Sequence, residues 1–314
     1  MNPKRKVIGI GETVFDIIFK NDRPVSAVPG GSTFNSMISM GRCGLEATFL
    51  SETGDDHIGD LVCAYLEKNG VSSADVDRGG KSHLSLAFLD EANDANYVFY
   101  KDHPHDRADV RIPEINPDDI VLFGSYYAVN PVIRTKVKSL LEYARSRGAI
   151  IYYDINFRPS HKAELPCLMQ AIEENCAFAD IIRGSNEDFF HVYGLTEYEK
   201  VQEIPILAGK NLIYTCGSKP TRLKANGGVS LEQVIMPVET VSTIGAGDNY
   251  NAGVIYSLVR DGIARNDLST GLGREEWHLI LETAQSFSRE CCMSIDNVVS
   301  QEFAEQMKNK IHTI

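Results

Sequence analysis

The chain has 314 residues, of which 43% are hydrophobic and 24% charged, a composition typical of a globular protein rather than a disordered one. Its 31 basic and 43 acidic residues give a net charge of −12, which argues against nucleic-acid or membrane-surface binding. The seven cysteines include no C-x-x-C pair, and we find neither a signal peptide nor an apolar run long enough to span a bilayer. We therefore expect a soluble, cytoplasmic protein that binds a small molecule.

Short apolar runs alternate with helical patterns along most of the chain. Strands are predicted at Val7–Ile10, Thr48–Ser51, Ile120–Phe123, Ala149–Tyr153, Ile181–Ile182, Leu212–Thr215 and Val234–Val238. Helices are predicted at Phe34–Cys43, Ile58–Asn69, Val132–Arg147, Leu165–Ala177, Asp248–Asp261 and Glu275–Met293. This alternation predicts an α/β fold, a mostly parallel doubly wound sheet in a single domain over residues 1–314. Ligands of such folds bind beyond the carboxyl ends of the strands.

Two stretches interrupt this alternation. Phe15–Val28 and Leu84–Tyr100 each resemble a pair of short strands around a polar turn. Hairpins without a crossover helix do not join a parallel sheet easily. We therefore predict a small β-strand lid made of two excursions, at about residues 12–30 and 82–104.

The segment Gly245-Ala246-Gly247-Asp248 lies at the start of a predicted helix. Small residues there allow backbone N–H groups to converge on an anion, and the helix dipole adds positive potential. Asp248 would stand in the first turn, where a carboxylate can take a proton from an attacking hydroxyl. A glycine turn with a capping aspartate explains these four residues equally well.

A second glycine pair, Gly30-Gly31, precedes another predicted helix that contains Asn35. Glycines permit a close backbone approach to a ligand, and an asparagine offers both a donor and an acceptor. Taken alone, a loop and a helix start is the better interpretation. Asp16 stands among apolar neighbours, either facing solvent or binding sugar hydroxyls.

Together, in this order and separation, the two glycine segments resemble the PfkB (ribokinase-like) family of carbohydrate kinases, and the resemblance extends over essentially the whole chain. Further motifs that match are Gly54-Asp55-Asp56 with Gly59, Tyr97–Lys101, Asp154–Pro159 and Thr215–Lys219. Asp154-Ile155-Asn156-Phe157-Arg158 is similar to the D-x-N-x-R element of the fructokinase and 2-keto-3-deoxygluconate kinase branches.

The resemblance implies an ATP-dependent sugar kinase with a ribokinase-like fold, which needs Mg²⁺ and has fructose as the leading substrate. It implies a general base at Asp248 and an anion hole at the amides of Gly245, Ala246 and Gly247. The sugar would contact Asp16, Gly30, Gly31, Asn35, Lys101 and Arg158, and ATP would contact Thr215, Gly217, Ser218 and Gln285. 2-Keto-3-deoxygluconate, ribose and a catalytically silent sugar- or nucleotide-binding regulator remain as alternatives. Exposed lid strands would also suit a homodimer.

The chain departs from the family pattern at two places. The N-x-x-E element falls at Ser185-Asn186-Glu187-Asp188, where neither possible frame matches fully, so Glu187 or Asp188 would serve the metal through water. Ser242 stands where the family has an aspartate before the glycine loop, which weakens the expected monovalent-cation site.

Overall fold

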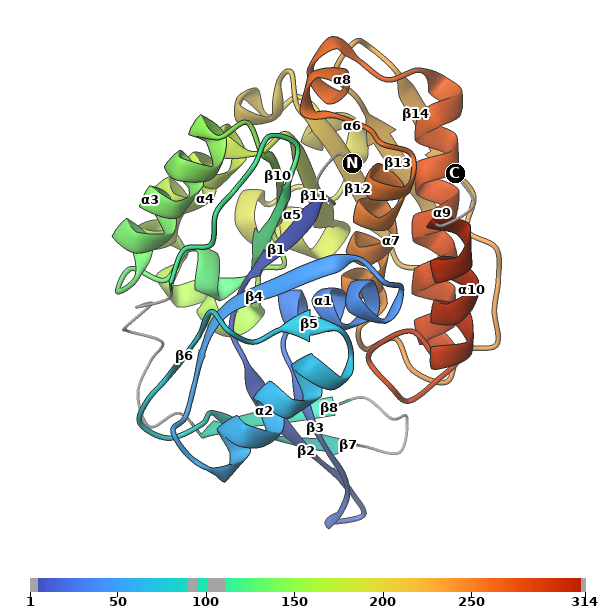
Figure 1. Cartoon of the computed structure of the whole chain (residues 1–314). Coiled ribbons are helices and arrows are strands. Elements are labelled where there is room, and N and C mark those ends of the chain that lie inside the picture. The colour runs from blue at the N-terminus through green and yellow to red at the C-terminus, as the bar shows by residue number, and fades with distance from the viewer. Residues whose placement is uncertain (1–4, 90–94, 101–110, 312–314) are drawn as a thin grey trace.

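The computed structural model describes residues 5–89, 95–100 and 111–311, and its central feature is a twisted, mostly parallel sheet (Figure 1). From one edge to the other its strands are β14 (Ser230–Gln233), β13 (Lys219–Lys224), β12 (Asn211–Cys216), β11 (Ile181–Ser185), β10 (Ile150–Asp154), β9 (Ile120–Gly124), β1 (Lys6–Ile10), β4 (Glu46–Thr53) and β5 (Val71–Ser72); β6 (Val76–Arg78) pairs with β4. All pairs are parallel except β12–β13 and β13–β14.

Helices cover both faces of this sheet (Figure 1). One face carries α1 (Ser32–Arg42), α2 (His57–Lys68), α7 (Ala246–Arg260), α8 (Arg265–Thr270), α9 (Arg274–Cys292) and α10 (Gln301–Ile311). The other carries α3 (Arg134–Ser146), α4 (Leu165–Phe178), α5 (Asn186–Tyr193) and α6 (Tyr198–Val201). The predicted mostly parallel, doubly covered sheet is confirmed.

Alternate residues of the central strands point into two separate cores. In β9, Ile120 and Leu122 belong to the core beneath α7 and α9, whereas Val121 and Phe123 belong to the core beneath α3 and α4. Both faces are therefore buried, which explains why these strands are continuous apolar runs instead of alternating ones.

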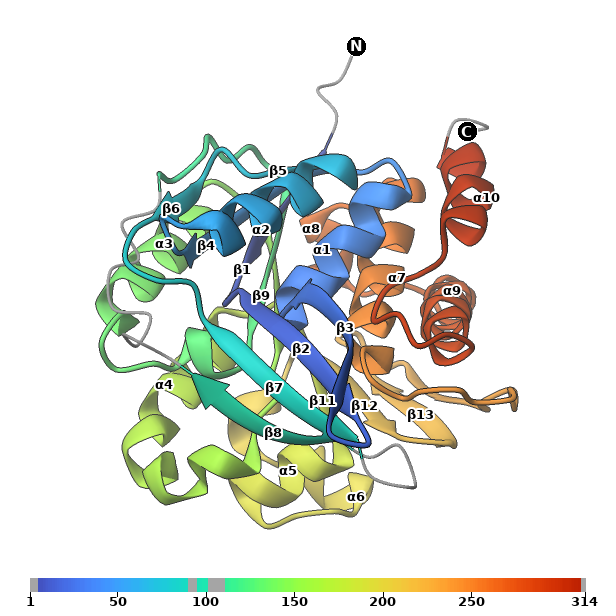
Figure 2. The same ribbon diagram turned by 90° about the horizontal axis from the view of Figure 1, so that it is seen from below.

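A separate sheet of four strands, the small sheet, is formed in the described chain by β2 (Val14–Lys20), β3 (Arg23–Gly30), β7 (Leu84–Leu89) and β8 (Ala95–Tyr100). Two antiparallel hairpins, β2–β3 and β7–β8, are joined by parallel pairing of β2 with β7. Figure 2 views the molecule from the side of this sheet, which lies across the foreground. The two hairpins were predicted as strand pairs, whereas the bounds 12–30 and 82–104, the single domain and the lid motion stay predictions.

The Gly54-Asp55-Asp56 motif connects the central sheet to the small sheet. The Asp56 carboxylate accepts a hydrogen bond from Gly59 N at 2.9 Å, which caps α2. It also accepts bonds from Ser82 N at 2.8 Å and Ser82 Oγ at 2.7 Å, two residues before β7 begins. The motif thus fixes the point where the chain enters the small sheet.

The sequence misplaced one strand near the edge of the central sheet. Val234–Val238 was predicted as a strand, but β14 ends at Gln233 and the following residues form no strand. Val234 and Met236 are instead 63% and 56% exposed. The strand prediction was wrong because the apolar residues in this segment do not face a core.

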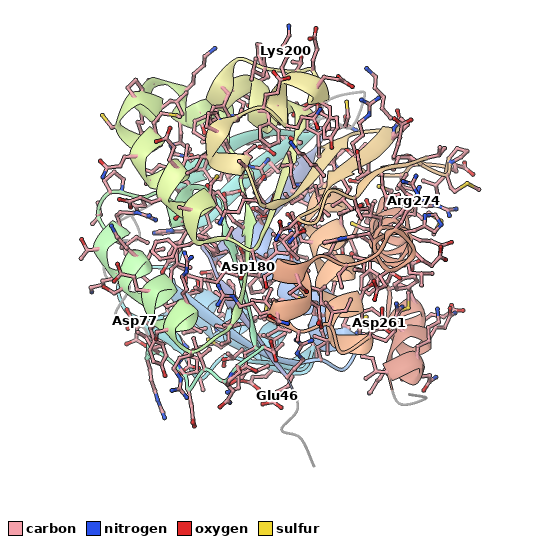
Figure 3. All side chains as sticks on the ribbon, turned by 90° about the horizontal axis from the view of Figure 1, so that it is seen from above. Glu46, Asp77, Asp180, Lys200, Asp261 and Arg274 are labelled. Atoms are coloured by element: carbon pink, nitrogen blue, oxygen red, sulfur yellow. The ribbon has the colours of Figure 1, made fainter. Side chains whose placement is uncertain are left out.

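The charge of the chain is spread over its outside. Figure 3 shows the labelled side chains of Glu46, Asp77 and Lys200 at the periphery of the molecule. In the described part of the chain, no helix is both long enough and apolar enough to cross a membrane.

Candidate active site

The N-termini of α1 and α7 meet, and Asp248 lies between them. Ser32 Oγ donates to Asp248 Oδ1 at 2.7 Å, and Asn35 Nδ2 donates to Asp248 Oδ2 at 2.9 Å. Ser36 Oγ also donates to the Asp248 carbonyl oxygen at 2.7 Å. Both carboxylate oxygens are therefore held in fixed directions where the positive ends of two helix dipoles converge.

The turn that precedes Asp248 requires glycine. Gly245 caps α7 with φ 81°, and a methyl group added there would stand 2.6 Å from the Asn297 carbonyl oxygen. The first amides of an α-helix have no intrahelical acceptor, so this turn presents N–H groups to a ligand. In this conformation Ala246 N donates to Thr243 O at 3.2 Å. The Ser242 hydroxyl accepts from Ile244 N at 3.2 Å.

The floor of the site is a buried polar network, Asp154, Arg183, Thr215 and Asn251, which joins three strand ends to α7. Arg183 Nη1 donates to Asp154 Oδ1 at 3.1 Å, and Arg183 Nη2 donates to Thr215 Oγ1 at 2.8 Å. Asn251 Nδ2 donates to Asp154 Oδ2 at 2.8 Å. Sequence reasoning missed Arg183, although a charged residue that follows the apolar pair Ile181-Ile182 was an available signal.

Burial raises the pKa of the acids of this site, and nearby positive charges lower it. Burial raises the pKa of Asp248, while the hydrogen bonds from Asn35 and Ser32 lower it. The positive charges of Arg158 and Arg183 lower it further. Burial raises the pKa of Asp154 to about 6, against the opposing charge of Arg183. Burial thus makes Asp248 more basic than a solvated aspartate, while its hydrogen-bond donors and the two arginines favour its charged form, which is the form that can take a proton.

Asp188 fixes the loop that follows β10. Asp188 Oδ1 accepts from Phe157 N at 2.8 Å, and Oδ2 accepts from Ser185 N at 2.7 Å. Ser185 and Asp188 therefore form the capping box of α5, so the frame of this element runs from Ser185 to Asp188. Glu187 is exposed on the first turn of α5. No group of three metal-binding side chains occurs in the described residues, so the metal role of Glu187 and Asp188 stays a prediction.

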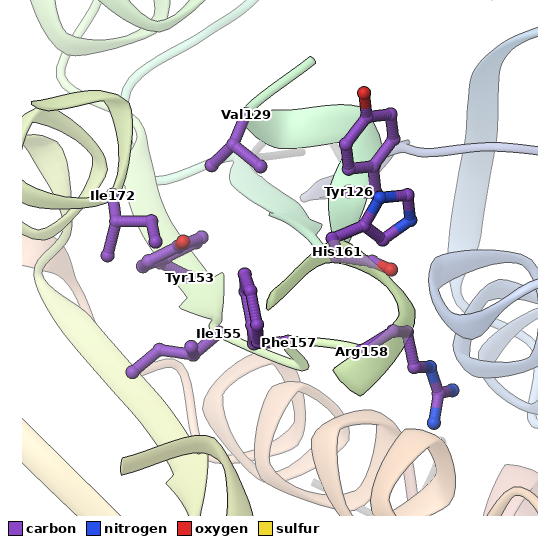
Figure 4. Close-up of a pocket in the computed structure, with 9 residues that line it drawn as sticks. Tyr126, Val129, Tyr153, Ile155, Phe157, Arg158, His161 and Ile172 are labelled. Carbon is purple, nitrogen blue, oxygen red and sulfur yellow. The ribbon is translucent and has the colours of Figure 1, made fainter. Parts of the chain in front are cut away.

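Arg158 stands at the mouth of a small recess in this loop (Figure 4). The inner wall is apolar and consists of Val129, Tyr153, Ile155, Phe157 and Ile172. At the mouth Tyr126 stacks on His161 with ring centroids 3.8 Å apart. The Arg158 side chain points away from the recess, and no carboxylate of the described residues forms an ion pair with it.

Asp16 lies on β2 of the small sheet, beside Gly30 at the end of β3. Ser85 Oγ donates to Asp16 Oδ1 at 2.7 Å, and burial raises the pKa of Asp16 to about 6. A methyl group added at Gly30 would stand 2.5 Å from Asp16 Oδ2. Gly31 has φ 137° and leads directly into Ser32 of α1. The predicted lid residue Lys101 lies outside the described residues.

The residues predicted to border the nucleotide fall into two groups. The Thr215 hydroxyl belongs to the buried network, where it accepts from Arg183. Gly217 and Ser218 form the exposed turn between β12 and β13, with φ 56° at Gly217. Gln285 lies on α9, where its side chain donates to Val234 O at 3.2 Å. No contact joins Gln285 to Asp248 within the described residues.

Comparisons with known proteins agree with this arrangement. Over 253 residues the chain is 29% identical to 5-dehydro-2-deoxygluconokinase of Geobacillus thermodenitrificans, which covers 73% of this chain and 72% of that protein. It is 25% identical to a probable fructokinase-4 of Arabidopsis thaliana over 280 residues, 82% of this chain and 83% of that protein.

Solved structures share the whole architecture. Aminoimidazole riboside kinase from Salmonella enterica has a TM-score of 0.81 at 18% identity and covers 98% of this chain and 100% of its own. A fructokinase variant from Vibrio cholerae has a TM-score of 0.82 at 17% identity, with 97% and 98% covered. These likenesses confirm the ribokinase-like α/β fold. Residues 4–272 match the model of the pfkB family carbohydrate kinases, so this chain belongs to that family and is a sugar kinase, a phosphotransferase.

Proposed function

We propose that this enzyme transfers the γ-phosphate of ATP to a hydroxyl of a keto sugar, with Asp248 as the general base. The observation that carries the proposal is the position of Asp248, a carboxylate of raised pKa that lies between two helix N-termini beside a glycine turn. Such a turn suits the phosphoryl group, and the carboxylate suits the acceptor hydroxyl.

Each part of the proposed mechanism uses a fixed group. Ser32 and Asn35 orient the Asp248 carboxylate, so a hydroxyl that reaches it finds its proton acceptor already aligned. Removal of that proton would contribute roughly 10²–10⁴-fold to the rate. The N–H groups of Gly245 and Gly247 would meet the negative charge of the transferred phosphoryl group, and Ala246 N–H would join them by giving up its bond to Thr243 O.

The chain offers more groups that could bind the nucleotide than groups that could bind its metal ion. The glycine turn at Gly245–Gly247 would form a cradle for phosphate. The Gly217-Ser218 turn, which directly follows β12, would border the same nucleotide. When bound, Mg²⁺ would neutralise part of the phosphate charge. No group of three metal-binding side chains occurs in the described residues, and Glu187 or Asp188, through water, would be the protein groups that hold the ion. A requirement for a monovalent cation stays doubtful because Ser242 replaces the acid.

For the acceptor we propose a keto sugar acid of the 5-dehydro-2-deoxygluconate type. The 5-dehydro-2-deoxygluconokinases of two Geobacillus species match this chain at 29% and 28% identity. Arg158 supports the proposal because its exposed guanidinium has no carboxylate partner among the described residues and could pair with the acid group of the substrate. Fructose is the second candidate, because a fructokinase matches over 82% of the chain.

A substrate panel with coupled ADP detection tests the function. We expect sugar-dependent ADP release with 5-dehydro-2-deoxygluconate that exceeds the rate with 2-keto-3-deoxygluconate, fructose or ribose. If fructose were the best substrate, the proposal of an acid substrate would be wrong, but the proposed kinase activity would stand. Binding of a sugar without any ADP release would instead support the catalytically silent regulator.

Arg158→Ala sharpens this test. We expect KM for an acid sugar to rise about tenfold or more, roughly the value of one charge-assisted hydrogen bond, while KM for fructose changes far less. Arg145→Ala, at another exposed arginine on α3, is the matched control and should change neither. Equal losses for the acid and the neutral sugar would contradict a carboxylate at Arg158.

Two further expectations stay predictions. A cytoplasmic location remains consistent with the absence of a membrane-spanning helix from the described residues. A homodimer through the small sheet is supported by β8, an edge strand on which Val98 and Tyr100 are 43% and 56% exposed.

A further inference from the structure

Arg183 lies directly against the glycine turn of α7. A methyl group added at Gly247 would stand 2.9 Å from Arg183 Nη2 and 3.0 Å from Nη1. The guanidinium therefore occupies the space that a side chain at this position would fill. Gly247 has a role beyond exposing its amide, since only glycine lets the cation contact the backbone of the phosphate cradle.

The cation is buried and fixed in orientation. Arg183 is 8% exposed, and its two terminal nitrogens are bonded to Asp154 and Thr215, at the ends of β10 and β12. Its Nε has no hydrogen-bond partner in the described part of the chain. Burial opposes its charge, whereas Asp154 and Asp188 raise the pKa of Arg183 above its usual value. The guanidinium thus stays charged in a site where water does not screen it.

Stability alone does not explain this arrangement. Replacing a buried ion pair by well-packed apolar residues is often neutral or stabilising, because desolvation of the two charges offsets their attraction. A fixed positive charge next to a phosphate cradle has another effect. It strengthens as transition-state charge develops on the phosphoryl oxygens and needs no reorganisation.

We infer that Arg183 is a positioning residue of phosphoryl transfer, whose guanidinium holds the first turn of α7 and supplies positive charge behind the cradle at Gly245–Gly247. The ligand is the terminal phosphoryl group of a nucleoside triphosphate, so the inference rests on the proposed function. Asp154 and Thr215 orient the guanidinium, and its planar fork fits both acceptors at once, which a lysine ammonium would not do.

The test compares Arg183→Met, the double variant Asp154→Asn/Arg183→Met, and Arg183→Lys. The single Met variant leaves a buried carboxylate without its cation and should lower the melting temperature. The double variant removes both charges and should regain most of that stability. We expect its kcat to remain at least about tenfold below wild type at an unchanged KM for the sugar, because cradle charge acts on the transition state.

Arg183→Lys keeps the charge without the fork, and we expect its kcat to lie between those of wild type and the double variant. A double variant that regains both wild-type stability and wild-type kcat would overturn the inference and leave Arg183 a structural residue. An Arg183→Lys variant no more active than the double variant would contradict the role of the charge.

Nucleotide binding separates this inference from the proposed function. Calorimetry with a non-hydrolysable ATP analogue and with ADP needs no sugar. We expect the double variant to bind ADP as wild type does and to lose about tenfold in affinity for the analogue, because the cation also attracts the charge that the terminal phosphate already carries in the ground state. Equal affinities of wild type and double variant for the analogue would overturn the role of Arg183. Analogue binding without turnover of any sugar by wild type would contradict only the proposed function.

Discussion

The floor of the site and the small sheet hold their polar groups in different ways. On the floor, Asp154 is 3% exposed and bonded to Arg183 and Asn251, and Asp188 accepts backbone bonds through both oxygens. In the small sheet, Asp16 has one hydrogen bond, from Ser85, and no cation among the described residues. The acids of the floor accept hydrogen bonds through both oxygens, whereas Asp16 has unused hydrogen-bonding capacity.

This difference in hydrogen bonding bears on which region serves phosphoryl transfer and which serves the choice of sugar. A carboxylate with both oxygens hydrogen-bonded cannot reorient cheaply, so Asp154 on the floor and Asp248 between Ser32 and Asn35 each keep one geometry. A carboxylate with unused acceptor sites is ready for hydroxyl donors that a sugar would bring. We propose that phosphoryl transfer depends on the floor together with Asp248 and the glycine turn, and choice of sugar on the small sheet. The variants below test this division.

Asp248→Asn should have the largest effect. An amide cannot take the hydroxyl proton, so we expect kcat to fall at least about a hundredfold, the lower end of the general-base range. The fold and nucleotide binding should persist, because Asn retains the shape of the side chain. Coupled ADP detection and calorimetry measure the two quantities.

Asp267→Asn is the matched control for that variant. Asp267 is also a first-turn carboxylate, on α8, where it accepts from Ala264 N at 2.8 Å. Its activity should equal that of wild type. Near-normal turnover in Asp248→Asn would remove the general base from the floor and with it the division between the two regions.

Asp188→Ala should mainly lower stability. The change leaves the amides of Phe157 and Ser185 without their side-chain acceptor, at a cost of about 2 kcal/mol for unsatisfied buried donors. Glu187→Ala, next to it and exposed, should stay within about 0.5 kcal/mol of wild type. Denaturant unfolding compares the two variants. A strong shift of the Mg²⁺ requirement in Glu187→Ala would show a metal role instead.

Asp16→Asn should have the smallest effect of these variants on stability, and it should raise the free energy of unfolding where Asp188→Ala lowers it. The folded-state pKa of Asp16, about 6, lies above its ordinary value of 3.8, so stability is lost progressively between about pH 4 and pH 6 and stays lost at higher pH. Asn resembles the protonated acid. We expect a gain of about 1 kcal/mol, roughly 2 °C in Tm, at pH 7.5 that disappears below about pH 4.

Thermal unfolding at the two pH values checks this prediction, with exposed Glu46→Gln as the control (Figure 3). The control should show no such pH-dependent gain. Destabilisation by Asp16→Asn at pH 7.5 would mean that the Asp16 carboxylate is satisfied within the folded protein, like the acids of the floor.

The repeating part of the fold could be predicted from sequence because burial on both faces leaves an unmistakable pattern. The run Val7–Ile10 became β1, Lys6–Ile10, and the helical pattern Leu165–Ala177 became α4, Leu165–Phe178. The edge hairpin β13–β14 could not, because edge strands mix exposed and buried residues. Lys219–Lys224, for example, contains four charged or polar side chains.

The residues of the site also differ in how far they could be predicted from sequence. Glycines and acids in local motifs, such as Gly245 and Asp248, were identified because neighbouring residues in sequence act together. Arg183 was missed because its partners Asp154 and Thr215 lie 29 and 32 residues away, so only the parallel strand ends bring them together. The metal role of Asp188 stays a prediction, and the sequence did not reveal that both of its oxygens accept hydrogen bonds from backbone amides.

The most direct test of the division is a parallel measurement of kcat and KM for one sugar in Asp248→Asn and Asp16→Asn. We predict that Asp248→Asn loses kcat at nearly constant KM, and that Asp16→Asn raises KM while most of kcat is retained. If Asp16→Asn lost kcat to the same extent as Asp248→Asn, with KM unchanged in both, the assignment of chemistry to the floor and sugar choice to the small sheet would be contradicted.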